Sequence, residues 1–135
     1  MSYLIDTCCI SELTKSKPDK NVIQWFSDHN EIDLYLSVIT FGELRKGIER
    51  LPSSKKKRKL THWINEDLLH RFKNRALDVT LKEVNQWGKV LAEAEKRGTP
   101  LPAYYHDALN LSRDICIARN HSRRNYLYKV LLEKW

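Results

Sequence analysis

The sequence predicts one α/β domain, a sandwich of helices around a mostly parallel sheet, over residues 1–135. Two short runs, at residues 2–6 and Leu34–Val38, have the nearly continuous apolar character of strands that are buried on both faces. Segments with helical periodicity alternate with these runs and with two later strand candidates. Because alternating strands and helices favour parallel pairing, we expect an α/β sandwich.

The first half of the chain supplies two strands and three helices. The strand at residues 2–6 is followed by a short helix from about Ser11 and by a second helix over Asp19–Asp28. The strand Leu34–Val38 leads into a helix over Thr40–Leu51, whose apolar residues recur at intervals of three and four. The order so far is therefore strand, two helices, strand, helix.

The second half begins with a helix over Ser54–Phe72, which forms a helical hairpin with the preceding helix by turning at Pro52. A third strand is predicted at Ala76–Val79. The clearest helix follows at Thr80–Arg97, because the sequence Thr-x-x-Glu opens it as a capping box and Gly98 closes it.

The last thirty residues are expected to add a short helix over His106–Arg113 and a fourth strand over Ile115–Ala118. No linker, repeat or low-complexity segment divides the chain. The sequence therefore predicts a single domain.

Composition narrows the class of protein. Its three cysteines, Cys8, Cys9 and Cys116, have neither the pattern of a disulfide framework nor the spacing of a zinc site, which favours a reducing compartment. Apolar runs stay far below the roughly 18 residues of a membrane span, and the amino terminus has no export signal. We therefore expect a cytoplasmic protein without membrane association.

The positive charge of the chain is local. Residues 45–75 hold 11 Lys and Arg against 3 Asp and Glu, a surplus of 8, whereas the whole chain has a net charge of +7. Clustered cations attract a phosphate backbone because binding releases its counterions. The centre of this segment is a candidate nucleic-acid contact, formed by Lys55, Lys56, Lys57, Arg58 and Lys59. A solvated helix face is the alternative interpretation.

Three carboxylates occur where strands end or helices start. Asp6 follows the first strand, Glu43 lies at the start of the helix after the second strand, and Asp107 begins the predicted short helix. Carboxylates at the carboxyl ends of parallel strands face the crevice in which α/β sheets bind ligands. A few hard oxygen ligands in one crevice suit Mg²⁺ or Mn²⁺.

Each carboxylate also has a structural interpretation. Asp6 is able to cap the helix that follows it. Glu43 stands three residues after Thr40, which is the pattern of a capping box. Asp107 is placed to complement a helix dipole. A catalytic thiol at Cys8 or Cys9 is the alternative to a metal site. The sequence has no Cys-x-x-Cys motif, and its pattern pairs no histidine with either cysteine, so this alternative has no support.

Several runs spread over almost the whole chain follow one pattern. They are Leu4-Ile5-Asp6-Thr7, Ile10-Ser11-Glu12-Leu13, Leu36-Ser37-Val38-Ile39-Thr40-Phe41-Gly42-Glu43-Leu44-Arg45-Lys46-Gly47-Ile48, Trp87-Gly88, Gly98-Thr99-Pro100-Leu101-Pro102 and Asp114-Ile115-Cys116-Ile117-Ala118-Arg119-Asn120. Together these runs resemble the PIN-domain ribonucleases that act as VapC-type toxins of bacterial toxin–antitoxin pairs.

The resemblance implies a PIN-like three-layer α/β/α sandwich whose acidic pocket holds Mg²⁺ or Mn²⁺ for RNA hydrolysis. Asp6, Glu43 and Asp107 match the family's first three acids. The resemblance assigns direct metal ligation to Asp6 and Asp107. It gives Glu43 ligation through water, or orientation of the nucleophile. The metal would neutralise the phosphate and lower the pKa of a bound water.

The same resemblance implies the partners. They are an antitoxin that blocks the acidic pocket, an RNA substrate of the transfer RNA class, operator DNA bound only through the antitoxin, and a second copy of the chain in a homodimer. These partners are expectations from the family and do not follow from composition or spacing.

The carboxyl-terminal part departs from the family pattern from about residue 107. Arg123 stands where the family usually places a fourth acid, and the helix from Asp107 is shorter than the family's. The final run Lys129–Leu132, with Trp135, resembles the closing strand. Loss of an acid lowers the negative charge that holds a cation, so activity is expected to be weakened. A PIN-like module that binds antitoxin or nucleic acid without turnover is the alternative.

Overall fold

Among the described residues the sheet has five strands, and its centre is the first strand of the chain. The computed structural model describes residues 2–98, 116–118 and 127–128. The strands are β1 Tyr3–Ile5, β2 Leu34–Ser37, β3 Ala76–Leu77, β4 Cys116–Ala118 and β5 Leu127–Tyr128. They pair in the order β3-β2-β1-β4-β5, and only the pairing of β4 with β5 is antiparallel. The predicted mostly parallel sheet is confirmed.

The order of the strands defines a switch point beside β1. From β1 the chain adds β2 and then β3 on one side, whereas β4 and β5 lie on the other. Leu4 is in register with Tyr35 of β2, and Ile5 is in register with Ala118 of β4. Open α/β sheets bind ligands outside the carboxyl ends of the strands at such a reversal. Asp6, which follows Ile5, therefore lies where such sheets bind ligands.

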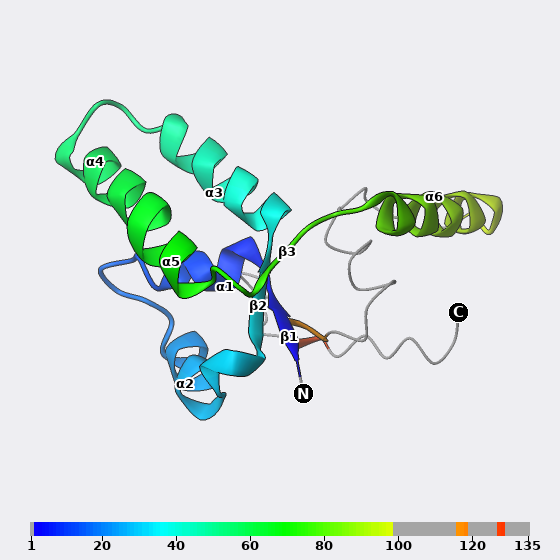
Figure 1. Cartoon of the computed structure of the whole chain (residues 1–135), viewed down its shortest axis with the longest axis horizontal. Coiled ribbons are helices and arrows are strands. Elements are labelled where there is room, and N and C mark those ends of the chain that lie inside the picture. Colours follow the sequence, from blue (N-terminus) through cyan, green and yellow to red (C-terminus); the bar gives the residue numbers. More distant parts are fainter. Residues whose placement is uncertain (1, 99–115, 119–126, 129–135) are drawn as a thin grey trace.

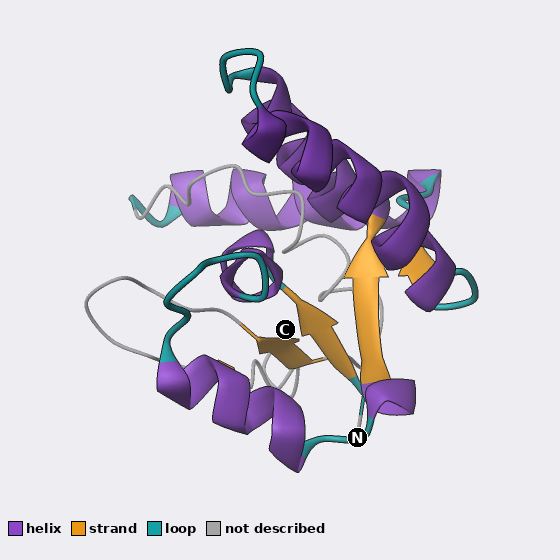
Figure 2. Ribbon diagram, turned by 90° about the vertical axis from the view of Figure 1, so that its left-hand side faces the viewer, coloured by secondary structure: helices purple, strands orange, loops and turns teal. Residues whose placement is uncertain are grey.

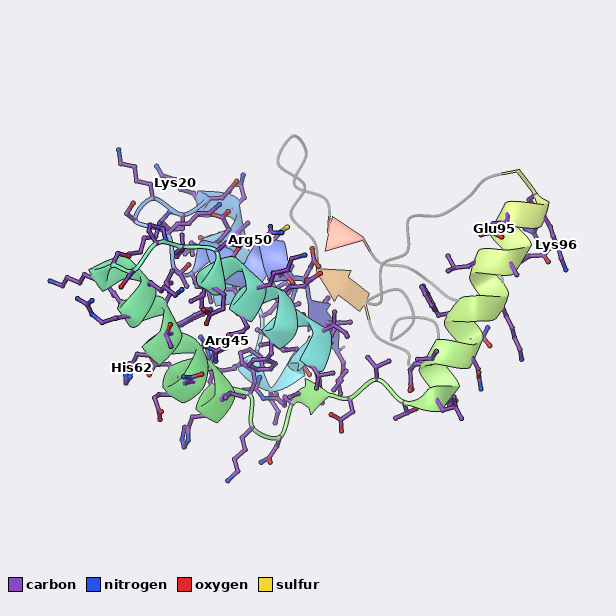
Figure 3. All side chains as sticks on the ribbon, turned by 90° about the horizontal axis from the view of Figure 1, so that it is seen from above. Lys20, Arg45, Arg50, His62, Glu95 and Lys96 are labelled. Atoms are coloured by element: carbon purple, nitrogen blue, oxygen red, sulfur yellow. The ribbon has the colours of Figure 1, made fainter. Side chains whose placement is uncertain are left out.

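Helices lie on both sides of this sheet. The helical elements are α1 Thr7–Glu12, α2 Lys20–Asp28, η1 Glu31–Asp33, α3 Val38–Glu49, α4 Lys55–His62, η2 Trp63–Leu68, α5 Leu69–Arg71 and α6 Leu81–Lys96. α1 to α5 lie on one side and α6 lies on the other (Figures 1 and 3). Figure 2 shows α2 and the α3–α4 hairpin at opposite ends of the sheet. This arrangement confirms the predicted α/β/α sandwich.

The core lies between the sheet and the helices α1, α3 and η2. Ile5 and Leu36 come from the central strands and are fully buried, and they join one cluster with Leu68 and Phe72. Trp63 is partly buried and packs against this cluster, so it is a core residue. Burial of these side chains fixes the α3–α4 hairpin against the sheet.

Two helices begin earlier than the sequence predicts. The first starts at Thr7, not near Ser11, because the carbonyl oxygen of Asp6 accepts the backbone N–H groups of Cys9 and Ile10 at 3.0 and 3.1 Å. α3 starts at Val38 within a β-branched run that favours a strand. In both cases burial of part of the first turn, Cys9 and Ile10 in α1 and Thr40 in α3, outweighs local propensity.

The long helix predicted over Ser54–Phe72 contains a wider turn. Its middle part, η2, is π-helical, and α5 completes it. Ile64, Leu68 and Phe72 are all buried although they are spaced by four residues. An α-helix rotates such a series by about 40° per step, and a wider turn reduces this drift, so the three side chains stay on one face.

The third predicted strand and the long second-half helix are both present. β3 covers Ala76–Leu77 of the predicted Ala76–Val79. The amide of Thr80 donates to Glu83 at 2.8 Å, which confirms the capping box of α6. Gly98 has φ of +71° and ends the helix, as predicted.

The predictions for the carboxyl-terminal part are tested only in places. β4 confirms most of the strand Ile115–Ala118. Two predictions lie outside the described residues, the helix His106–Arg113 and the closing run Lys129–Leu132. The described strand β5, Leu127–Tyr128, directly precedes that run. Within the part of the chain that is described, no helix has the length and apolar character needed to cross a bilayer.

Candidate active site

Asp6 occupies the carboxyl end of the central strand, at the switch point. It is half-buried and directly precedes α1, with φ of −73° and ψ of 155°. Its side chain makes no capping hydrogen bond to α1, whose first turn is bound by the Asp6 carbonyl oxygen instead. Asp6 is therefore the N-cap residue of α1 through its main chain, but its carboxylate does not supply the cap that the structural interpretation expected.

Glu43 is brought to the same place from the next βα unit. α3 starts directly after β2, so Glu43 lies in its second turn. The hydroxyl group of Thr7 donates a hydrogen bond to Glu43 Oε2. Since Thr7 is the residue after Asp6, this contact ties the second acid to the neighbour of the first acid across 36 positions of sequence.

The predicted capping box of α3 is wrong. Ser37 is the N-cap of the helix, and its hydroxyl oxygen accepts the amide of Thr40 at 3.0 Å. Thr40 is therefore already the third residue of the helix and is fully buried. Glu43, by contrast, is exposed and has its carboxylate available to Thr7. The structural interpretation of Glu43 as a helix cap no longer applies.

The pKa of the Cys8 thiol depends on both acids. Partial burial raises its pKa, the negative charges of Asp6 and Glu43 raise it further, and a hydrogen bond to Asp6 adds to the effect. Both carboxylates thus raise the pKa of one partly buried thiol in the first turn of α1. A raised pKa keeps this thiol protonated at neutral pH, which argues against a nucleophilic cysteine here.

Glu12 supports this region from within the fold. Its side chain is 8% exposed, forms an ion pair with Lys15 and accepts the amide of Asp19 at 2.9 Å. The Lys15 ammonium and the Asp19 amide hold the pKa of Glu12 below its usual value. This ionised, buried carboxylate fixes the loop between α1 and α2, and thereby the position of α1 behind Asp6.

Sequence reasoning selected Asp6 and Glu43 but missed Thr7 and Glu12. The structure brings Asp6 and Glu43 into one region, whereas Asp107 and Arg123 lie outside the described residues. Over residues 2–98 and the short pieces of β4 and β5, no group of three or more His, Cys, Asp or Glu side chains has the geometry of a metal site. The donor types fit Mg²⁺, since carboxylate oxygens are hard ligands.

The basic segment lies on the hairpin, away from these acids. Lys55, Lys56, Arg58 and Lys59 are exposed on α4, and Lys57 is partly buried. Glu43 is the sixth of the twelve residues of α3, whereas α4 begins after the turn beyond the far end of that helix (Figure 1). The candidate nucleic-acid contact is therefore separate from the candidate acidic site.

Sequence similarity to known proteins extends over most of the chain. It is 34% identical over 95 residues to the plasmid stability protein StbB of Pseudomonas syringae pv. tomato and 32% identical over 95 residues to the VapC ribonuclease Y4jK of Sinorhizobium fredii; each match covers 70% of this chain and 68% of the relative. It is 31% identical over 100 residues to the toxin FitB of Neisseria gonorrhoeae, covering 74% and 72%. No protein-family model matches the sequence.

Solved structures show the same fold. FitAcB from Neisseria gonorrhoeae aligns with a TM-score of 0.76 and 26% identity, over 89% of this chain and 88% of that chain. FitAB bound to an IR36 DNA fragment gives 0.76 and 25%, over 90% and 86%. VapBC-1 from nontypeable Haemophilus influenzae gives 0.68 and 25%, over 91% and 89%.

The mostly parallel sandwich, in which Thr7 directly after Asp6 binds Glu43 at the carboxyl edge of β1, is that of a PIN-like domain. Three relatives share more than 30% sequence identity with this chain over at least two thirds of their length, which identifies the family within this class. The chain belongs to the VapC-type toxins, the PIN-domain toxins of toxin–antitoxin pairs.

Proposed function

We propose that this chain is a metal-dependent endoribonuclease and the toxin of a type II toxin–antitoxin pair. The hydrogen bond from Thr7 to Glu43 carries this proposal, because it holds the second acid beside the residue that follows Asp6. A relative named VapC ribonuclease and another named toxin FitB support the activity and the role. The reaction is hydrolysis of an RNA phosphodiester bond.

Asp6 and Glu43 would hold Mg²⁺ or Mn²⁺ together with Asp107. The resemblance to the family supplies the third ligand, and the carboxylate chemistry of the first two supports the choice of metal. When bound, such an ion neutralises phosphate charge and lowers the pKa of a coordinated water.

The residues of the chain divide the remaining work. Asp6 is fixed by the main chain, since its carbonyl oxygen starts α1 while its carboxylate stays at the edge of the sheet. Glu43 accepts a hydrogen bond at one oxygen from Thr7, which leaves the other oxygen to orient an attacking water. Thr7 is therefore a positioning residue for Glu43.

The partners proposed are those of the family. Transfer RNA is the substrate class, a cognate antitoxin is the inhibitor, operator DNA is bound only through that antitoxin, and the chain forms a homodimer in the cytosol. Solved neighbours described as FitAB and VapBC complexes, some with DNA, support the antitoxin and the indirect contact with DNA.

Cleavage of a total RNA pool tests the proposal. The full chain is assayed with Mg²⁺, with Mn²⁺ and with EDTA, beside the variants Asp6→Asn and Asp67→Asn. Asp67 is an exposed acid of η2 and serves as the matched control. We expect cleavage by the parent and by Asp67→Asn only when metal is present, and none by Asp6→Asn.

Two results would contradict the proposal. Equal cleavage by Asp6→Asn and the parent would remove Asp6 from the reaction. Salt-sensitive RNA binding by the parent without turnover in either metal would instead support the binding module without catalysis.

A further inference from the structure

α4 presents an exposed basic face. The helix opens with five consecutive cations, Lys55 to Lys59, and ends at His62. At 100° per residue, the exposed side chains of this helix fall within about 160° of its circumference. They are Lys55, Lys56, Arg58, Lys59 and His62. The opposite side holds Lys57, Leu60 and Thr61, which are all partly buried.

Lys57 differs from its neighbours because it is bound within the fold. Its ammonium forms an ion pair with Glu49 Oε2 at 3.2 Å and donates to the carbonyl oxygens of Glu49 and Leu51 at 3.2 and 3.3 Å. These contacts fasten α4 to the end of α3. The sequence-based set of five nucleic-acid contacts is thereby reduced to four, and Lys57 becomes a structural cation.

The other four cations have no anionic partner among the described residues. Lys55, Lys56, Arg58 and Lys59 form no ion pair with a described carboxylate. The first turn of α4 contains no acidic residue. Its cations lie at the positive end of the helix dipole, where the interaction is repulsive. Clustered positive charges repel one another and so destabilise the folded state. Such a cluster is expected where an external polyanion neutralises it.

The chemistry of this face favours a nucleic-acid backbone over a membrane or a protein. A helix that binds membranes exposes Trp, Phe or Leu beside its cations, whereas Leu60 and Trp63 pack against the core. Protein interfaces are depleted in Lys and depend on aromatic or apolar anchors. None of the exposed side chains of α4 is apolar.

We propose that the basic face of α4, formed by Lys55, Lys56, Arg58 and Lys59, docks the phosphate backbone of the RNA substrate outside the acidic site. The proposal rests on the proposed function for the identity of the polyanion. α3 connects the two sites, and it rises about 9 Å between Glu43 and its last residue, Glu49. One RNA chain can thus engage both, and lysine contacts to phosphate make docking independent of sequence.

Binding of a fluorescently labelled transfer RNA in EDTA tests the proposal, since EDTA prevents metal-dependent cleavage. The test variant combines Lys55→Gln, Lys56→Gln, Arg58→Gln and Lys59→Gln. The control combines Lys20→Gln, Lys82→Gln, Lys89→Gln and Lys96→Gln, four exposed cations on α2 and α6. Both variants lower the net charge by the same amount, so a difference between them reports the place of the charge.

We expect the α4 variant to bind RNA at least tenfold more weakly at physiological salt. Its plot of log K against log salt should be shallower by about 3, because four phosphate contacts contribute about 0.7 to 0.9 each. The control should stay within about twofold of the parent, because dispersed cations make few simultaneous phosphate contacts. Thermal unfolding followed by circular dichroism verifies that both variants are folded.

Equal RNA affinity of the two variants would overturn the docking surface, as would a loss confined to duplex DNA or to vesicles of phosphatidylserine. Cleavage with Mg²⁺ is measured in parallel. If the parent binds RNA through α4 without cleaving it, the proposed function fails and the docking surface stands. If the parent cleaves RNA and both variants bind it alike, the docking surface fails alone.

Discussion

The hydroxyl group of Thr7 donates a hydrogen bond to the carboxylate of Glu43. Thr7 opens α1 after the central strand, and Glu43 belongs to α3 after the neighbouring strand. Because the pairing of β1 with β2 is parallel, both helices leave the same edge of the sheet, and the contact joins them there. It is the connection through which the fold holds two distant acids in one region.

Replacement of Thr7 by Val is expected to lower the rate of RNA cleavage about tenfold or more while preserving the fold. Valine has the same shape but leaves the Glu43 carboxylate without its donor, so its orientation is lost. Thr7→Ser keeps the hydroxyl group and should restore most of the rate. Single-turnover cleavage separates this effect from binding. A Thr7→Val protein that cleaves as fast as the parent would show that the bond does not position Glu43.

Asp6→Asn is expected to lower the pKa of Cys8. Burial and the charges of Asp6 and Glu43 raise this pKa above its ordinary value, and the variant removes one of the two charges. The pH dependence of Cys8 alkylation, followed by mass spectrometry of the peptide, should move to lower pH. Asp67→Asn is the control and should leave the profile in place. An unchanged profile in Asp6→Asn would mean that Asp6 does not act on the thiol.

Glu12→Ala should lower the free energy of unfolding by about 1–3 kcal/mol at neutral pH, because it leaves the buried amide of Asp19 without its acceptor. The pKa of Glu12 is lowered in the folded state, so its ionic contribution is present above the ordinary carboxyl pKa and is lost as the pH falls through the lowered value.

Urea unfolding at neutral and acidic pH checks the role of Glu12. The difference between Glu12→Ala and the parent should shrink on acidification. Glu95→Ala, at an exposed position of α6, should have a negligible effect at either pH (Figure 3). A difference that grows as the pH falls would contradict the assigned direction.

Reversal of charge at the start of α4 is expected to stabilise the protein. Lys55 and Lys56 oppose the helix dipole, so Lys55→Glu and Lys56→Glu should each add about 0.3–1 kcal/mol to the free energy of unfolding at low salt. Lys96→Glu, in the last turn of α6, should act in the opposite direction. Thermal unfolding at two salt concentrations measures both. Destabilisation by the α4 variants would imply a native partner for these lysines.

Arg123→Asp is expected to increase the affinity for Mg²⁺ or Mn²⁺ and the rate of cleavage. It would restore an acid at the position where the resemblance places a fourth carboxylate and would remove a cation. Metal titration of RNA cleavage, with Arg124→Asp as the neighbouring control, measures the change. Identical metal dependence in the parent and in both variants would reject the account of the missing acid.

The local patterns of the sequence predicted much of the fold. Apolar runs located β1 and β2, and the capping box with Gly98 bounded α6 within one residue. Asp6 could be selected from its place after a buried strand. These features depend on periodicity and on hydrogen bonds between residues close in sequence, which a single segment contains.

Other features needed the assembled fold. Thr40 and Glu43 have the local pattern of a capping box, but Ser37 caps α3 because the helix begins directly at the end of β2. Thr7 carries no local signal for Glu43, since 36 positions separate them. Lys57 resembles its neighbours until the hairpin places it against Glu49.

The sequence by itself determined the approximate positions of most strands and helices, where the negative and positive charges lie, and the resemblance to a toxin family. Only the tertiary structure decided which side chains meet. The physical reason is the order of the sheet: parallel pairing of β1 with β2 places α1 beside α3, and no local pattern specifies that pairing.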